Sequence, residues 1–319
     1  MTSTVFFFFL GFFLLFFGGE LLVRGSVALA LRMKITTLVV GMTVVAFATS
    51  SPELFVTLKA IFEESSNIAL GNAIGSNIAN IGLVLALTAI IFRVKISKQT
   101  LSLNFPIMLG ASCLFGLVLY FFKGIPSIFG LLFLILLFLF VRFLIIISRR
   151  EHLANEDKQD AILEDSKRDS LLKSIVILVL GVFLLKYGAD FLVDATKILA
   201  KNLGVSDRVI AVTVISIGTS IPELATSIIA ALRKEENLAV GNLLGSNIFN
   251  ILAVLGITAS VKEIHIGDPE IFSFDYLWMM IVTLILGFFI YVFSKQNISR
   301  REGFFLFFMY LFYMYKTLV

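Results

Sequence analysis

Two polar segments, TSSPEL at residues 49–54 and GNAIGSNIAN at residues 71–80, recur as TSIPEL at residues 219–224 and GNLLGSNIFN at residues 241–250. Both copies are displaced by 170 positions, and five of six and seven of ten residues are the same. The shared residues are mostly Thr, Ser, Pro, Glu, Asn and Gly. A duplicated lipid-facing surface would preserve Leu and Phe instead, so the repeat indicates a functional site.

The chain around these segments is too apolar for an ordinary soluble domain. Of its 319 residues, 59% are hydrophobic, whereas soluble domains have about 45–50%. Backbone polar groups must be satisfied internally in lipid, and apolar stretches near twenty residues favour helices. The sequence therefore predicts an all-α polytopic protein of the cell membrane, in contact with the lipid bilayer. The scattered Lys and Arg residues give no sign of a nucleic-acid partner.

Ten apolar segments are long enough to be transmembrane helices. They lie near residues 5–31, 36–62, 68–92, 100–122, 125–148, 171–200, 205–232, 238–262, 274–294 and 301–318. They form a first five-helix repeat at 1–148, with its motif region at 41–80, and a second at 171–319, with its motif region at 211–250. Five is odd, so equivalent helices cross the membrane in opposite directions and the repeats are inverted, as in many secondary transporters.

The loop charges predict an N-out/C-out orientation, because Lys and Arg stay on the cytoplasmic side. With the N-terminus outside, the inside loops hold sixteen of these residues and the outside loops five. The polar linker 149–170 is then cytoplasmic. The start, MTSTVFFFFL, has no basic residue before its apolar run, so we expect no removable signal peptide. A single cysteine, Cys113, excludes an intramolecular disulfide.

Glu53 and Glu223 lie in the middle of predicted spans, each directly after a proline. A charge at the bilayer centre costs at least about 2.5–3.5 kcal/mol on insertion scales, so two such charges indicate function. Proline removes a backbone donor and disturbs the preceding turn. We expect oxygens that can bind a cation to be freed near Ala46, Thr49, Ser216 and Thr219.

A polar stripe recurs at every fourth residue of the third and eighth spans. It consists of Asn72, Ser76, Asn80, Asn242, Ser246 and Asn250. The glycines beside it, Gly71, Gly75, Gly241 and Gly245, would let a neighbouring helix approach closely. Any one of these residues could serve helix packing alone; their duplication together with two central glutamates favours ion binding.

The candidate ligands are carboxylate, hydroxyl, amide and carbonyl oxygens, which hard cations prefer. The two histidines lie in polar loops, so zinc or copper is not expected. Calcium or sodium fits the ligand set, and we expect no cofactor besides these transported ions. Burial without a counter-ion disfavours the charged form of a carboxylate, so the empty site should take up ions or protons, as an antiporter requires.

Other charged residues lie in the first and sixth spans. Their i,i+4 spacing permits pairs between Glu20 and Arg24 and between Lys186 and Asp190, with Asp194 one turn further on. We expect structural pairing or an entry vestibule here in preference to direct ion binding.

The segments GMTVVAFATSSPEL (41–54) and AVTVISIGTSIPEL (211–224), each followed by GNxxGSNIxN, resemble the calcium:cation antiporter superfamily. The chain looks like a prokaryotic sodium/calcium exchanger over nearly its whole length. This resemblance implies a core of predicted helices 2, 3, 7 and 8, with helices 1 and 6 sliding to alternate access.

The resemblance also implies the ligands. It places calcium at Glu53, Glu223, Thr49 and Thr219. It places sodium at Ala46, Thr49, Ser50, Glu53, Ser76, Ser216, Thr219, Ser220, Glu223 and Ser246. Asn80 and Asn250 match the central polar pair, and Asn72 and Asn242 are further candidates.

Three residues depart from the family pattern. Asn250 stands where some prokaryotic members and the potassium-dependent branch have an aspartate, which argues against potassium dependence and weakens proton binding there. Ala48 stands where glycine is frequent and Ser216 where alanine is frequent, so the helix break or its hydration can differ. No charged ligand is lost.

The sequence thus predicts an antiporter, not an enzyme, that exchanges Ca²⁺ for Na⁺ by alternating access and extrudes Ca²⁺. The alternative is a Ca²⁺/H⁺ exchanger that uses the same two glutamates, against which the Ser and Thr sodium ligands argue. A cation channel is a further class and would show rapid uncoupled current. No His pair, zinc motif or Ser/Lys arrangement accompanies the glutamates, so an intramembrane enzyme is disfavoured.

Overall fold

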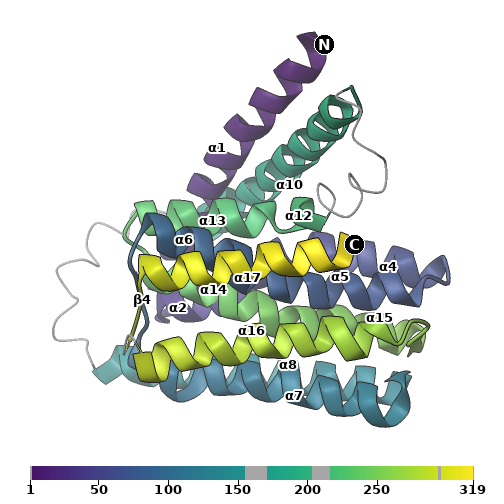
Figure 1. Cartoon of the computed structure of the whole chain (residues 1–319). Helices are drawn as coiled ribbons and strands as arrows, with labels where there is room; N and C mark the ends of the chain where they lie inside the picture. Colours follow the sequence, from purple (N-terminus) through teal and green to yellow (C-terminus); the bar gives the residue numbers. More distant parts are fainter. Residues whose placement is uncertain (1, 155–170, 203–215, 294–295, 319) are drawn as a thin grey trace. The chain divides into compact units, whose positions relative to one another are not determined.

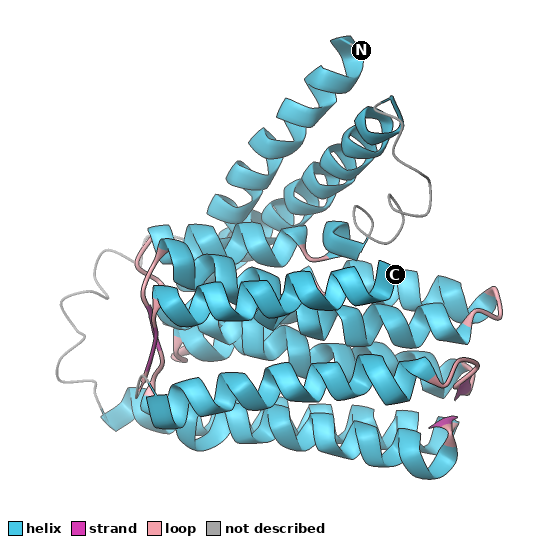
Figure 2. Cartoon of the chain, in the orientation of Figure 1, coloured by secondary structure: helices cyan, strands magenta, loops and turns pink. Residues whose placement is uncertain are grey.

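The fold is described from a computed structural model, for residues 2–154, 171–202, 216–293 and 296–318. Nearly all of these residues are helical, with two pairs of very short strands (Figure 2). Seven helices are long and apolar enough to cross a membrane, or eight if Thr37–Thr49 and Ser51–Phe62 form one broken span. The prediction of an all-helical membrane protein is confirmed.

Two of the ten predicted spans, 205–232 and 301–318, are not among these seven or eight helices. Residues 205–232 contain α12 (Ser216–Thr219) and α13 (Ile221–Leu232), while 301–318 falls in α17 (Arg300–Leu318). Residues 203–215 lie outside the described residues, and with them the start of that span and of motif region 211–250. Most of the predicted linker 149–170 also lies outside them, since α8 (Ser127–Ala154) is described only to its end at Ala154.

The chain divides into two compact units, Met1–Thr49 with Leu139–Asn242 and Ser50–Phe138 with Leu243–Val319. Each unit contains residues of both predicted repeats. The first unit holds α1 (Thr2–Met33), α2 (Thr37–Val40), η1 (Gly41–Val45, π-helical), α3 (Ala46–Thr49), the end of α8, α10 (Leu171–Asn202), α12, α13 and the start of α14 (Glu236–Phe249).

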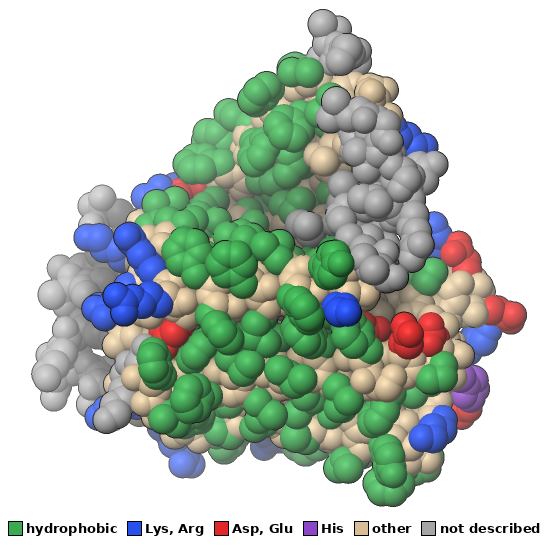
Figure 3. Space-filling view, in the orientation of Figure 1, with side chains coloured by type: hydrophobic (Ala, Val, Ile, Leu, Met, Phe, Trp, Pro, Cys, Tyr) green, Lys and Arg blue, Asp and Glu red, His purple; other side chains and the backbone are tan. Residues whose placement is uncertain are grey.

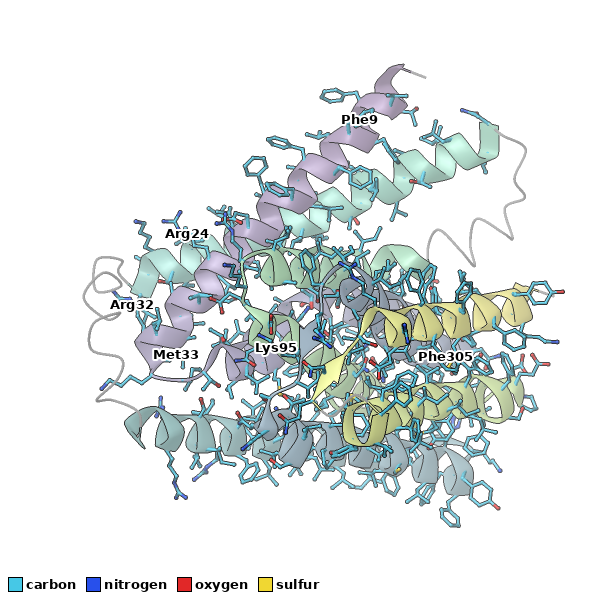
Figure 4. All side chains as sticks on the ribbon, turned by 60° about the vertical axis from the view of Figure 1, so that its left-hand side comes forward. Phe9, Arg24, Arg32, Met33, Lys95 and Phe305 are labelled. Atoms are coloured by element: carbon cyan, nitrogen blue, oxygen red, sulfur yellow. The ribbon has the colours of Figure 1, made fainter. Side chains whose placement is uncertain are left out.

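In the first unit, α1 packs along α10 in antiparallel fashion (Figure 1). Glycines allow the close approach: a Cβ on Gly18 would lie 2.7 Å from the nitrogen of Leu185, and one on Gly181 would lie 2.6 Å from the nitrogen of Leu22. Helix α13 lies against both α1 and α10. Figure 4 shows Arg24 and Arg32 toward the end of α1 that carries Met33, with Phe9 toward the other end.

The second unit is built around two long helical rods. One runs through α5 (Ser66–Ala79), η2 (Asn80–Leu85) and α6 (Ala86–Ile91), and the other through the end of α14, η6 (Asn250–Leu255) and α15 (Gly256–Val261). Around them lie α4 (Ser51–Phe62), η3 (Thr100–Asn104), α7 (Phe105–Phe122), the start of α8, η7 (Ile271–Tyr276), α16 (Leu277–Phe288), η8 (Phe289–Phe293) and α17. The two rods form the buried centre of this unit.

Two antiparallel strand pairs fasten the loops of the second unit. Strand β1 (Val94–Lys95) pairs with β4 (Asn297–Ile298), with Val94 opposite Ile298. Strand β2 (Gly124–Ile125) pairs with β3 (Ile264–His265), with Gly124 opposite His265. Each pair joins one loop of the first repeat to one loop of the second. Two loops that are distant in the sequence therefore lie side by side in each pair.

The outer faces of the helices carry large apolar side chains. On the face that Figure 3 shows, hydrophobic residues cover the outward sides of the helices. On α1, for example, Phe6, Phe9 and Phe13 are 62%, 65% and 58% exposed. Such surfaces are unfavourable in water, and in a bilayer they face lipid.

Candidate cation-binding site

Glu53 lies at a helix break, as the sequence predicts. Helix α3 ends at Thr49 and α4 begins at Ser51, with Pro52 in its first turn and Ser50 between them at φ −82° and ψ 4°. The Glu53 side chain is in the first turn of this twelve-residue helix and is 1% exposed. The partial positive charge of a helix N-terminus stabilises a carboxylate at this position.

The second repeat contains the same break in the first unit. Helix α12 ends at Thr219, Ser220 has φ −89° and ψ 1°, and α13 begins at Ile221 with Pro222 in its first turn. Glu223 is 1% exposed. The buried Oγ atoms of Ser50 and Ser220 have no hydrogen-bond partner among the described residues, so both hydroxyls are available as ligands.

Asn72 connects α5 to α4, the helix that begins at the break. Its Nδ2 donates to the main-chain oxygen of Glu53 at 3.1 Å and to Oγ1 of Thr57 at 2.9 Å. Through Asn72, the polar stripe therefore contacts the glutamate-bearing helix in the second unit. Asn72 acts here as a hydrogen-bond donor, with its amide nitrogen turned to the helix.

Asn242, the counterpart of Asn72, makes a different contact in the first unit. Its Oδ1 accepts a hydrogen bond from Oγ1 of Thr49 at 3.1 Å. The Thr49 hydroxyl also lies 3.5 Å from the carbonyl oxygen of Ala46. The side-chain nitrogen of the fully buried Asn242 has no hydrogen-bond partner within the described part of the chain.

Four asparagines meet at the centre of the second unit. Asn80 donates from Nδ2 to Oδ1 of Asn247 at 3.1 Å, and Asn250 donates from Nδ2 to Oδ1 of Asn77 at 3.1 Å. Asn80 and Asn250 each begin a π-helical segment, η2 and η6. Such local widening of a helix is frequent at functional sites.

The predicted ligands fall into two groups by unit. The first unit holds Ala46, Thr49, Ser216, Thr219, Ser220, Glu223 and Asn242, and the second holds Ser50, Glu53, Asn72, Ser76, Asn80, Ser246 and Asn250. Within the second unit, hydrogen bonds link Asn72 to Glu53, while Asn80 and Asn250 are both joined to the Asn77/Asn247 pair. Ser76 and Ser246 are buried.

Sequence reasoning missed Asn77 and Asn247. Both are duplicated at the same spacing of 170, inside GSNI, which was the available signal; they fall outside the every-fourth-residue stripe. It also missed their sulfur partners. Asn247 Nδ2 lies 3.6 Å from the sulfur of Met108, and Asn77 Nδ2 lies 3.6 Å from the sulfur of Met279.

The glycines beside the stripe differ from the prediction. Gly241 does allow close approach, because an added Cβ would overlap the carbonyl oxygen of Leu38. A Cβ added to Gly71 would lie 3.9 Å from its nearest neighbour, Cδ1 of Ile271. A Cβ added to Gly75 would have no heavy atom within 4 Å in the described part of the chain. For these two glycines the prediction of tight helix contact is wrong, because the spacing identifies a helix face without identifying its neighbour.

Glu20 also has an unexpected partner. It forms an ion pair and hydrogen bonds with Arg233, at the end of α13, whereas local spacing had suggested Arg24. The pair joins α1 to α13 within the first unit, and the Arg233 side chain is 59% exposed. Glu20 is therefore paired, as expected, but with a different partner.

The predicted ligands among the described residues are oxygen donors, the type that hard cations prefer. They contain no cluster of three or more His, Cys, Asp or Glu side chains that could hold a metal. In each unit, the predicted ligands comprise one glutamate together with neutral Ser and Asn side chains, and none of them is a thiolate or an imidazole. Few charges and many neutral oxygens suit a cation that must be released again.

Comparisons with known proteins show which proteins this chain resembles. The family model described as sodium/calcium exchanger protein matches residues 3–146 and 173–319. The chain is 34% identical to inner membrane protein YrbG of Escherichia coli (strain K12), over 87% of this chain and 85% of that protein. It is 29% identical to sodium/calcium exchanger MaX1 of Methanosarcina acetivorans, over 90% of each. A solved structure of the sodium-calcium exchanger NCX_Mj, soaked with zero Na⁺ and Ca²⁺, is similar with a TM-score of 0.82 and 30% identity, over 97% of both chains.

Proposed function

Because the chain belongs to the sodium/calcium exchanger protein family, we propose that it extrudes Ca²⁺ in exchange for Na⁺, by alternating access around Glu53 and Glu223. The chain is a multi-pass membrane antiporter of cations and not an enzyme. Its substrates are Ca²⁺ and Na⁺, as the family implies. In the proposal it uses no resident cofactor.

The single observation that carries the proposal is the repeated helix break. Ser50 and Ser220 have nearly the same backbone angles, and each is followed by a proline and a buried glutamate in the first turn of a twelve-residue helix. Burying a carboxylate is costly unless its charge is compensated, and a bound cation would supply that compensation at both glutamates. Inverted repeats that carry interrupted helices are typical of secondary transporters.

The proposed ligands come from both copies of the repeated motif. Glu53 and Glu223 supply negative charge for Ca²⁺, with oxygen atoms of Thr49 and Thr219. For Na⁺, the hydroxyls of Ser50, Ser76, Ser220 and Ser246 join the glutamates, the two threonines and the carbonyl oxygens of Ala46 and Ser216. Two carboxylates neutralise either one Ca²⁺ or two Na⁺, which couples the two ions through competition for the same charges.

We also propose ten transmembrane helices with both ends of the chain outside. The strand pairs support this topology within the second unit. Pair β1/β4 brings the loop of Arg93, Lys95 and Lys98 to the loop that leads to Arg300 and Arg301, all predicted inside. Pair β2/β3 joins two loops that are both predicted outside.

The test is uptake of radioactive calcium into proteoliposomes that contain the purified full chain. Vesicles loaded with Na⁺, with K⁺ or with an acidic interior are compared, with an ionophore to clamp the voltage. Uptake only with internal Na⁺ supports the proposal. Uptake driven by the acidic interior alone would favour a Ca²⁺/H⁺ exchanger, and rapid current without a trans ion would indicate a channel.

A further inference from the structure

The asparagine cluster of the second unit forms two crossed chains of hydrogen bonds. In the first, Asn80 donates to Asn247 at 3.1 Å, and Asn247 donates to the sulfur of Met108 at 3.6 Å. In the second, Asn250 donates to Asn77 at 3.1 Å, and Asn77 donates to the sulfur of Met279 at 3.6 Å. Each chain passes from one repeat to the other and back.

The direction of each chain is set at its methionine. A thioether sulfur has no hydrogen and can only accept a hydrogen bond, so Asn247 must turn its NH₂ group toward Met108. The side-chain oxygen of Asn247 then faces Asn80, which must donate a hydrogen bond from its own NH₂ group. The same logic runs from Met279 through Asn77 to Asn250, and the Asn77 amide also donates to the main-chain oxygen of Asn247 at 3.3 Å.

The outcome is the same at both ends. Asn80 and Asn250 are 2% and 1% exposed, and the Oδ1 atom of each accepts no hydrogen bond from any residue that the structure describes. Buried amide oxygens nearly always have a partner. Two oxygens that are held in one orientation and lack a protein donor are therefore suited to a cation or to water bound in its place.

We infer that Met108, Met279, Asn77 and Asn247 are positioning residues that force Asn80 and Asn250 to present oxygen, and not NH₂, to the transported cation. This inference rests on the proposed function and on the expectation from the sequence that Asn80 and Asn250 form the central polar pair. A flipped amide would direct its donor group at the cation, which repels it. The sulfur atoms do not contact the cation in this inference; they act on ion binding through Asn247 and Asn77, which orient Asn80 and Asn250.

The test compares leucine with glutamine at Met108 and Met279, because a packing role and a positioning role predict opposite orders of severity for these two substitutions. Met108→Leu and Met279→Leu conserve volume and polarity but remove the sulfur acceptor of the inner asparagine, while Asn77 keeps the main-chain oxygen of Asn247 as a second acceptor. Met108→Gln and Met279→Gln retain an acceptor, the glutamine Oε1, in a chain of similar length. If the methionines serve packing only, Leu is the milder change at these buried positions, because volume-conserving apolar swaps are tolerated best.

The experiment uses the purified full chain. Apparent affinities for Na⁺ and Ca²⁺ are measured from the concentration dependence of transport and from the ion-dependent rise in Tm. We expect the Leu variants to lose about tenfold in affinity for at least one of the two ions, and the Gln variants to lie closer to the parent protein. Met314→Leu, at a buried methionine outside the cluster, is the matched control and should leave both affinities unchanged.

Two results would overturn the inference: parental affinities in both Leu variants, or Gln variants that bind more weakly than Leu variants. A parent protein without Na⁺-dependent Ca²⁺ uptake would overturn the proposed function instead. In that event the Tm measurements still compare Leu with Gln, so the two failures are distinguishable.

Discussion

Asn72 and Glu53 are joined by a hydrogen bond from the Asn72 side-chain amide to the Glu53 main-chain oxygen, at 3.1 Å. The contact fastens α5 to the first turn of α4, where the proposed charged ligand lies. The equivalent Asn242 uses its oxygen and accepts from Thr49 at 3.1 Å. The two copies of one motif thus serve different contacts in the two units.

Removing the Asn72 amide should impair transport through this contact. Asn72→Ala loses the bonds to both Glu53 and Thr57, so we expect kcat/KM for calcium uptake to fall by about tenfold, in proportion to about 1–1.5 kcal/mol. Thr57→Val removes only the second bond and is the matched control, with a smaller loss expected. Equal losses in both variants would show that the link to the Glu53 carbonyl has no special part.

Neutralising either proposed charged ligand should abolish calcium transport without unfolding the protein. Glu53→Gln and Glu223→Gln keep the side-chain shape and remove one of two negative charges, and unbalancing a buried ionic site costs about 3–5 kcal/mol, or about a hundredfold or more in affinity. Radioactive calcium uptake measures the effect, and size-exclusion profiles check the fold. Glu263→Gln, at a half-exposed loop carboxylate, is the control. Parental uptake in both site variants would refute the assignment.

Glu235, between α13 and α14, makes stability depend on pH. Partial burial raises its pKa above the ordinary value of 4.5, because desolvation disfavours the charged form. Since the folded-state pKa is the higher one, ionisation lowers the free energy of unfolding. The cost is absent below the unfolded pKa and fully present above the folded pKa.

Glu235→Gln should therefore raise Tm relative to the parent at about pH 8 and leave it unchanged near about pH 4. Glu236→Gln is the neighbouring control. Glu236 lies in the first turn of α14, where a carboxylate is favoured by the helix dipole, so its removal should lower Tm at neutral pH. A rise in Tm for both variants would point to general charge reduction and not to burial of Glu235.

Gly41 is required for close packing within the first unit. A Cβ at this helical position would lie 2.6 Å from the carbonyl oxygen of Leu238, so Gly41→Ala should lower stability by about 1–3 kcal/mol through overpacking. Gly110→Ala is the matched control, since an added Cβ meets nothing within 4 Å among the described residues. Alanine there should stabilise α7 by up to about 1 kcal/mol. Thermal unfolding in detergent measures both; similar Tm values would contradict the packing argument.

The sequence predicts those features that depend on local chemistry. Proline disturbs the preceding turn and is tolerated in the first turn of a helix, where Pro52 and Pro222 both lie, so both breaks and the buried glutamates beside them were predictable. The partner of Glu20 was not, because Arg233 is distant in the sequence and the i,i+4 rule sees only one helix. Met108 and Met279 lie outside the repeated motifs, and their proposed role depends on which end of a distant amide each sulfur meets in the folded unit.

The strand pairs of the second unit lead to a direct test of orientation. Lys95 pairs with Asn297 and lies with the basic loops predicted inside. Lys262 lies two residues before β3, in a loop predicted outside. In a Cys113→Ser background, each lysine is replaced by cysteine and intact cells receive a membrane-impermeant maleimide. Because positive loops stay in the cytoplasm, we expect Lys262→Cys to react in intact cells and Lys95→Cys to react only after permeabilisation. The reverse pattern would invert the topology and with it the proposed direction of each half, while leaving the helix breaks unchanged.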